Sequence, residues 1–222
     1  MYGTFIIETR SAKGGTGRTS LACAIALFSQ QYNGQTLLVT DHTGDAAAVL
    51  AMPSLNEGHL AEHTSGLQVA QWNWTSKDAL RSICPEARFI VTDMLEPLTG
   101  GEVQDDNTTT VTVCPPAYLA LRRQTRSGST RPEHLYTYEM AGAPLTPKDV
   151  KSVLQPSEMT LTGSWSADIA RAIDAGLFAS RFMDGHSIYE PMRRAAASLW
   201  GYVMAAEGKS RDYSEAFEGA AR

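Results

Sequence analysis

Cysteine is scarce in this sequence, and long apolar runs are absent. The 222 residues include three cysteines, Cys23, Cys84 and Cys114, and no CxxC pair. An odd and scattered set of this kind argues against a disulfide framework or a zinc cage and favours a reducing compartment. No stretch approaches the ~20 apolar residues that a membrane span needs. The start, MYGTFIIETR, has no basic segment followed by a long apolar one, so we expect a cytoplasmic protein without a signal peptide.

Positive charge is also in short supply. The formal net charge is −5, which gives no global attraction to nucleic acid or to an anionic membrane. The exception is LRRQTRSGSTR, where Arg122, Arg123, Arg126 and Arg131 have no acid between them. This arginine cluster has three interpretations: a solvated helix end, a contact for DNA phosphates, or a contact for a protein partner. The polar tail at 209–222 does not predict a membrane anchor.

Several catalytic and metal signatures are missing as well. The sequence shows no Ser-His-Asp elbow and no catalytic cysteine signature. His59 and His63 have the spacing of a helical ligand pair, but no third ligand follows nearby. A histidine metal centre is therefore not expected.

The order of elements predicts the fold class. Apolar segments of strand length alternate with helical patterns along most of the chain, and no internal repeat or low-complexity tract interrupts them. We expect an α/β protein with a mostly parallel twisted sheet and helices on both faces, as a single domain over 1–208. The expected strands are 5–9, 35–41, 67–72, 87–93, 109–116, 134–140 and 159–163, and the expected helices are 19–31, 45–52, 76–83, 117–125, 146–154, 166–176 and 188–207.

The segment SAKGGTGRTS at 11–20 concentrates the residues of a phosphate-binding loop. It joins a short buried strand to an apolar helix pattern, and Gly14, Gly15 and Gly17 allow backbone N–H groups to converge on an anion. The helix N-terminus adds partial positive charge. The expected nucleotide-binding residues are Gly14, Gly15, Thr16, Gly17, Arg18, Thr19 and Ser20, with the Thr19 hydroxyl available to Mg²⁺. The alternative is a glycine-rich turn that binds nothing.

The run Lys13 to Thr19, KGGTGRT, resembles the deviant Walker A motif of the ParA/MinD-type ATPases. Further stretches resemble that family over residues 3–180, namely LLVTD (37–41), RFIVTD (88–93), VTVCPPAYLALRR (111–123) and SWSADIARAIDAG (164–176). The resemblance implies that the α/β fold is of P-loop NTPase type, with ATP and Mg²⁺ as ligands and Asp93 as the acid near the metal. It also implies that Lys13 reaches the partner's nucleotide in a homodimer that sandwiches ATP.

Four departures from the family pattern bear on activity. Arg18 replaces a lysine, and a planar guanidinium distributes its charge differently from an ammonium. Thr43 replaces the second acid after the 35–41 strand, which leaves Asp41 and Asp45 as candidates to orient the attacking water. Asp45 is equally well explained as a helix N-cap. Bulky Met94 and Leu95 follow Asp93, and Glu139 stands where the family places an adenine-reading asparagine.

These observations support two hypotheses. The first is a ParA/MinD-like ATP-binding protein, a slow ATPase that dimerises on Mg·ATP and acts as a spatial switch for the partition or positioning of DNA or a protein assembly. Its catalytic residues would be Lys13, Asp41 and Asp45, and its metal ligands Thr19 and Asp93. The second is a non-enzymatic, degenerate P-loop scaffold that docks a protein partner.

Overall fold

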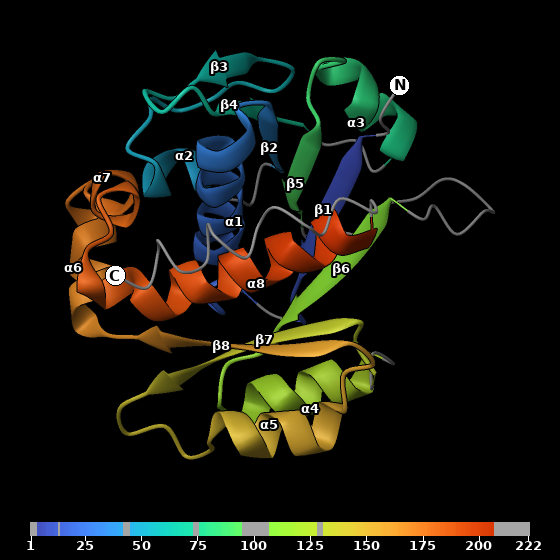
Figure 1. The fold of residues 1–222 in the computed structure, drawn as a ribbon. Coiled ribbons are helices and arrows are strands. Elements are labelled where there is room, and N and C mark those ends of the chain that lie inside the picture. The colour runs from blue at the N-terminus through green and yellow to red at the C-terminus, as the bar shows by residue number, and fades with distance from the viewer. Residues whose placement is uncertain are drawn as a thin grey trace.

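The computed structural model describes residues 4–12, 14–41, 45–72, 76–94, 107–127 and 131–206. Its centre is one eight-stranded sheet with the order β3-β4-β2-β5-β1-β6-β7-β8 (Figure 1). All neighbouring strands pair in parallel except β3, which is antiparallel to β4 at one edge. The strands are β1 (Phe5–Arg10), β2 (Thr36–Thr40), β3 (Leu60–Glu62), β4 (Gln68–Gln71), β5 (Phe89–Asp93), β6 (Thr108–Val113), β7 (His134–Met140) and β8 (Met159–Trp165).

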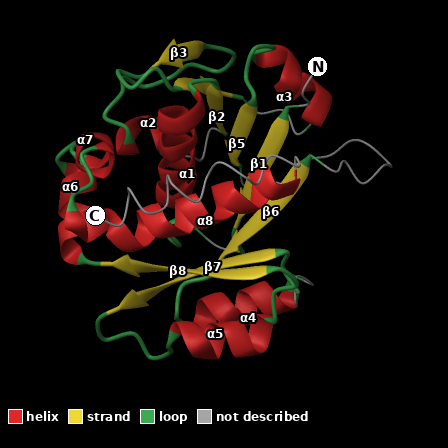
Figure 2. Cartoon of the chain, viewed as in Figure 1, coloured by secondary structure: helices red, strands yellow, loops and turns green. Residues whose placement is uncertain are grey.

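Helices cover both faces of the sheet, as the alternation of elements predicts (Figure 2). The main apolar cluster joins Ile7 and Val91 of the sheet to α1 and α8 on one face. On the other face, α3 packs over Ile6 and Ile90, and α4 and α5 cover Leu135. The helices are α1 (Arg18–Asn33), α2 (Ala46–Val49), α3 (Lys77–Ile83), α4 (Tyr118–Arg126), α5 (Pro147–Leu154), α6 (Ala167–Asp174), α7 (Phe178–Met183) and α8 (Glu190–Ala206), with a 3-10 turn η1 (Ser187–Tyr189).

The central strands are buried on both sides, which explains their sequence. Every residue of β2 (TLLVT) and β5 (FIVTD) is buried, because a parallel sheet between two helical layers leaves no solvated face. Full burial of a Leu or Ile side chain contributes about 1.5–3 kcal/mol. These strands therefore form a rigid base for the loops that follow them.

Three helix ends are set by residues close to them in sequence. α1 ends at Gly34, whose φ of 70° lies in the left-handed region that glycine adopts without strain. The Ser76 hydroxyl accepts a hydrogen bond from the amide of Ala79 at the start of α3. Thr146 and Asp149 form a capping box before α5, with Pro147 at its first turn.

The structure also contains elements that the sequence pattern did not predict. The three-residue strand β3 is too short to show a period, and α7 lies between the helices expected over 166–176 and 188–207, where no element was predicted. The 3-10 turn η1 overlaps the start of the helix expected over 188–207, and α8 begins at Glu190. The helix expected over 45–52 is shorter, since α2 ends at Val49 and Ala51 has a φ of 56°. The tail at 209–222 lies outside the described residues. Within the part of the chain that is described, no helix is long and apolar enough to cross a bilayer.

Candidate nucleotide site

The loop between β1 and α1 lies at the carboxyl edge of the sheet. Gly15 and Gly17 have φ values of 68° and 81°, so both need glycine in this conformation. A side chain at Gly14 or Gly15 would meet no atom within 4 Å, and both residues are exposed. The loop backbone is therefore open to a ligand. Lys13 lies outside the described residues.

A pocket of about 700 Å³ opens on this loop. Its size lies within the range of small-molecule and cofactor sites. The structure brings all seven predicted nucleotide-binding residues to its wall, and the hydroxyl of Thr16 is buried without a hydrogen-bond partner among the described residues. The lining consists of Ser11, Gly14, Gly15, Thr16, Gly17, Arg18, Thr19, Ser20, Asp45, Ala48, Val49, Trp165, Ala170, Ile173 and Asp174.

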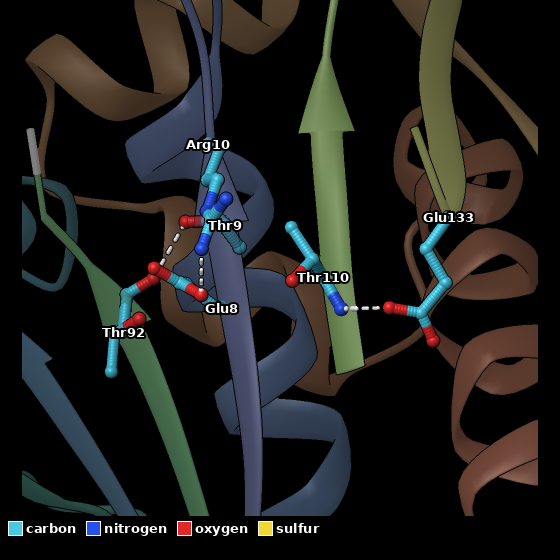
Figure 3. Close-up of polar contacts among 6 residues, drawn as sticks. All are labelled: Glu8, Thr9, Arg10, Thr92, Thr110 and Glu133. Carbon is cyan, nitrogen blue, oxygen red and sulfur yellow. Dashed lines mark hydrogen bonds and ion pairs between the residues drawn. The ribbon is translucent and has the colours of Figure 1, made fainter. Parts of the chain in front are cut away.

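The strand before the loop holds the loop through polar contacts that the sequence did not reveal. The Thr9 hydroxyl donates to the carbonyl of Thr92 on β5 over 2.7 Å, and Arg10 Nη2 donates to Glu8 Oε2 over 2.6 Å (Figure 3). Glu8 is buried, and it sits in the middle of a strand that the apolar pattern describes as simply hydrophobic. The Thr9 hydrogen bond joins the end of β1 to β5 at the base of the loop, and the Arg10–Glu8 contact lies within β1.

A buried ion pair joins the first residue of α1 to the last residue of β5. Arg18 Nε lies 2.6 Å from Asp93 Oδ1, and the two side chains are 10% and 0% exposed. Asp93 Oδ2 is also buried and has no hydrogen-bond partner among the described residues. Burial raises the pKa of Asp93 above its ordinary value, and the Arg18 guanidinium and the nearby Thr19 hydroxyl oppose that rise.

Asp41 and Asp45, the two candidates for orienting water, occupy different environments. Asp41 is buried directly after β2, its amide donates to the Asp93 carbonyl over 3.3 Å, and its charge further raises the pKa of Asp93. Asp45 is exposed and lines the pocket. It stands at the N-cap position of α2, but its side chain makes no capping hydrogen bond. The alternative interpretation of Asp45 thus holds for its position and not for its side chain.

Oxygen ligands suitable for Mg²⁺ gather at this edge. The Thr19 hydroxyl and the Asp41 carboxylate both lie near Asp93. Asp93 Oδ2 has no hydrogen-bond partner among the described residues. Carboxylate and hydroxyl oxygens are the donors that Mg²⁺ prefers. The residues therefore fit the metal in chemical type, although the other oxygen of Asp93 is bound by Arg18. Across the described ranges, no cluster of three or more His, Cys, Asp or Glu side chains forms a metal site.

Two aromatic residues of the site were missed by sequence reasoning. The Tyr138 hydroxyl donates to the backbone carbonyl of Thr16 over 3.2 Å, and its ring lies 3.8 Å from where a side chain on Gly17 would begin. Trp165, at the end of β8, lines the pocket, with its ring centroid 6.1 Å from that of Tyr138. Both are 120 or more positions from the loop in sequence, so no local pattern could connect them to it.

Other predicted residues lie elsewhere. Glu139 is exposed and lines a separate groove with Arg194, so it does not line the loop pocket. Met94 is buried in the apolar cluster under α3.

The arginine cluster lies away from the pocket, with Arg122, Arg123 and Arg126 exposed on α4 and Arg131 exposed beyond it. Two of these side chains lie in the last turn of α4, where cations complement the helix dipole.

The mostly parallel eight-stranded sheet, with helices on both faces and a glycine loop between its central strand and first helix, is the P-loop NTPase fold of MinD and ParA proteins. The chain is similar to the MinD cell division protein of Aquifex aeolicus, with a TM-score of 0.70, 15% identity, and 89% of this chain and 97% of that chain covered. No family model and no curated protein matches the sequence.

Two further structures have the same fold. One is the septum site-determining protein MinD complexed with Mg-ADP from Pyrococcus horikoshii, with a TM-score of 0.67, 14% identity, and coverage of 89% and 96%. The other is a ParA family ATPase from Chlorobium tepidum, with a TM-score of 0.65, 12% identity, and coverage of 89% and 99%. At these identities the similarity establishes the fold, and the ligand must be argued from the site.

Proposed function

We propose that the protein is a MinD/ParA-like ATP-binding protein and a slow ATPase that dimerises on Mg·ATP and acts as a spatial switch. The observation that carries this proposal is the pocket at the glycine loop. Its wall contains a helix N-terminus, three glycines, a cation and hydroxyl groups, which together suit a polyphosphate. The MinD structure with the same fold was solved with Mg-ADP, which supports a nucleotide as the ligand.

Each residue has a role in this proposal. The amides of 14–19 and the Arg18 guanidinium would bind phosphate oxygens, and Thr19 with Asp93 would hold Mg²⁺. The metal, when bound, would neutralise charge on the transferred phosphoryl group. Asp41 or Asp45 would orient the attacking water, and Trp165 supplies an aromatic surface in the pocket for the base. Turnover would be slow because Arg18 replaces a compact lysine charge and Thr43 replaces an acid.

Dimerisation and the switch role follow from the resemblance of the KGGTGRT motif. Lys13 would cross to the partner's nucleotide, so ATP would join two copies and hydrolysis would separate them. The homodimer would then position DNA or a protein assembly in the cytoplasm. The exposed arginine cluster of 122–131 would contact the DNA phosphates or the protein partner.

The alternative function, a scaffold without hydrolysis, is favoured by one observation. Arg18, the residue expected on the phosphates, is bound to Asp93, the residue expected near the metal. A protein that keeps this pair closed would bind nucleotide weakly or not at all. It would act by docking a partner.

A thermal-shift titration with Mg·ATP, Mg·ADP and buffer alone separates these functions. A ligand that binds the folded state raises the midpoint by mass action, so a concentration-dependent rise supports the nucleotide site. Thr19→Ala should weaken the rise, whereas Ser152→Ala, which removes an exposed hydroxyl on α5, should not. No rise at millimolar nucleotide leaves only the scaffold, and phosphate release at rates typical of kinases contradicts slow turnover.

A DNA role is tested by charge reversal. Arg122→Glu with Arg123→Glu should abolish the retention of nonspecific DNA and leave the thermal shift with Mg·ATP intact, because these side chains lie away from the pocket. Lys148→Glu with Lys151→Glu, two exposed cations on α5, is the matched control. Unchanged retention in the arginine variant excludes the cluster as a DNA contact.

A further inference from the structure

The ion pair between Arg18 and Asp93 is placed where two ligands of the proposed site would act. Arg18 lines the loop pocket and is the first residue of α1, so its side chain starts within reach of a bound anion. Asp93 ends β5, the strand next to β1. The guanidinium is therefore located between the loop, where an anion would bind, and Asp93, where a cation would bind. In the structure it contacts Asp93, with Arg18 Nε 2.6 Å from Asp93 Oδ1.

A divalent metal and a guanidinium compete at such a carboxylate. The Arg18 side chain is almost fully buried and Asp93 is fully buried, so solvent screens the repulsion between two cations weakly. Arginine stays charged under all ordinary conditions and cannot yield the site by losing a proton. The metal can take Asp93 only if the guanidinium moves.

Departure of Arg18 from Asp93 is also unfavourable unless another cation takes its place. If Arg18 left Asp93 with nothing in its place, an uncompensated carboxylate would remain in the interior, which is strongly unfavourable. Asp93 Oδ2 already lacks a hydrogen-bond partner among the described residues, and the charge of Asp41 is close by. A cation must therefore replace Arg18 as it leaves. An anion in the loop pocket is the one ligand that would draw it away.

We propose that Arg18 is the resting cation of Asp93, and that it excludes divalent metal from this carboxylate until an anion in the glycine loop draws the guanidinium away. Metal and nucleotide then bind as a coupled pair, each weak without the other. The metal-exclusion half of this inference stands on the ion pair itself, and the coupling half rests on the proposed nucleotide site. Arg18 is thus a positioning residue for the metal as well as a phosphate ligand.

Manganese binding to the nucleotide-free full chain, followed by electron paramagnetic resonance of the free ion, tests the exclusion half. The wild type should bind Mn²⁺ weakly, and Arg18→Gln should bind it at least about tenfold more tightly. Arg18→Gln/Asp93→Asn should lose that gain. Arg171→Gln is the matched control, since it breaks an exposed Arg–Asp pair on α6 and should leave Mn²⁺ binding unchanged. Equal Mn²⁺ affinity in the wild type and Arg18→Gln overturns the proposal.

A second variant covers the case in which Arg18→Gln does not fold. Asp93→Asn keeps Arg18 and removes the negative charge that holds it, so the guanidinium is free for the loop. The affinity for fluorescent ADP in EDTA should then rise by about tenfold over wild type, and unchanged affinity contradicts the inference. If no variant binds nucleotide while Arg18→Gln still gains Mn²⁺, the proposed function fails and the exclusion by Arg18 stands.

Discussion

Two carboxylates at opposite edges of the same sheet differ in how completely their oxygens are hydrogen-bonded. Asp93 follows β5 at the carboxyl edge, with one oxygen on Arg18 and the other without a partner among the described residues. Glu133 precedes β7 at the amino edge, where both oxygens accept hydrogen bonds. The Thr110 amide donates to Oε2 over 2.8 Å (Figure 3), and the Thr109 hydroxyl donates to Oε1 over 2.6 Å.

The pKa values of the two acids follow this difference. Burial tends to raise both. At Glu133 the hydrogen bonds from His134, Thr109 and the Thr110 amide outweigh burial, and the pKa lies below its ordinary value. At Asp93 burial outweighs the opposing effects of Arg18 and Thr19, and the pKa lies above its ordinary value. A fully satisfied carboxylate serves the fold, whereas an incompletely satisfied one beside an open pocket has bonding capacity left for a ligand.

Removing the cation from the incompletely satisfied acid should have the largest effect on stability. Arg18→Ala leaves Asp93 buried and unpaired, which should lower the free energy of unfolding by about 3–5 kcal/mol. Urea denaturation measures the loss. Arg171→Ala, which breaks an exposed ion pair, should cost at most about 1 kcal/mol. Equal losses in the two variants would show that the Arg18–Asp93 pair is not buried in solution.

Removing Glu133, whose two oxygens are both hydrogen-bonded, should have a smaller effect on the free energy of unfolding. Glu133→Ala deprives the Thr109 hydroxyl and the Thr110 amide of their acceptor, and the expected loss of unfolding free energy is about 1–3 kcal/mol. Because Glu133 lies at the opposite edge of the sheet, this variant should keep the full thermal shift with Mg·ATP. A loss of the nucleotide response here would mean that the two edges are coupled, contrary to the comparison.

The two acids should have opposite effects on the pH dependence of stability. Glu133, with its lowered pKa, stabilises the fold above its unfolded-state value near 4.5, and this contribution disappears as pH falls through the folded-state pKa. Asp93, with its raised pKa, costs stability once pH rises from 3.8 through its folded-state pKa.

Urea denaturation between about pH 2.5 and 7 measures both signs, because the Glu133 contribution changes below pH 4.5 and the Asp93 contribution changes above pH 3.8. The deficit of Glu133→Gln relative to wild type should shrink as pH falls. The stability of Asp93→Asn relative to wild type should improve as pH rises. Slopes of the same sign for the two variants would contradict the assignment of one satisfied and one incompletely satisfied carboxylate.

The smallest expected effect concerns the loop backbone. Tyr138→Phe removes the hydrogen bond to the Thr16 carbonyl and keeps the ring, so stability should fall by about 0.5–1.5 kcal/mol. Nucleotide affinity should fall with it, because the carbonyl lies in the binding loop. Tyr32→Phe, on a residue outside the pocket, provides the control. Unaltered nucleotide affinity in Tyr138→Phe would show that this contact does not position the loop.

The sequence predicted those parts of the molecule in which neighbours in sequence are neighbours in space. The glycines of the loop lie between a strand and a helix as predicted. Gly34 at the end of α1 and the Thr146 cap likewise act within a few residues. The parallel sheet follows from alternating elements in the same way. Short or irregular segments such as β3 and α7 have too little periodicity to be recognised.

The tertiary parts of the site could not be predicted in this way. Arg18 and Asp93 were assigned separately, one to phosphate and one to metal, and their pairing spans 75 positions. Tyr138 and Trp165 reach the loop only because β7 and β8 extend the sheet beside it. Asp45 had two interpretations from sequence, and only the three-dimensional structure shows that its side chain does not cap α2.

The central claim is that the pocket at the glycine loop binds a nucleoside triphosphate. Isothermal titration of the full chain with ATP in the presence of Mg²⁺ tests it most directly. The account predicts saturable binding at one site per chain, lost in Gly17→Asp, which places a carboxylate at a positive φ in the loop. The absence of saturable heat at millimolar ATP, or full binding by Gly17→Asp, would contradict it.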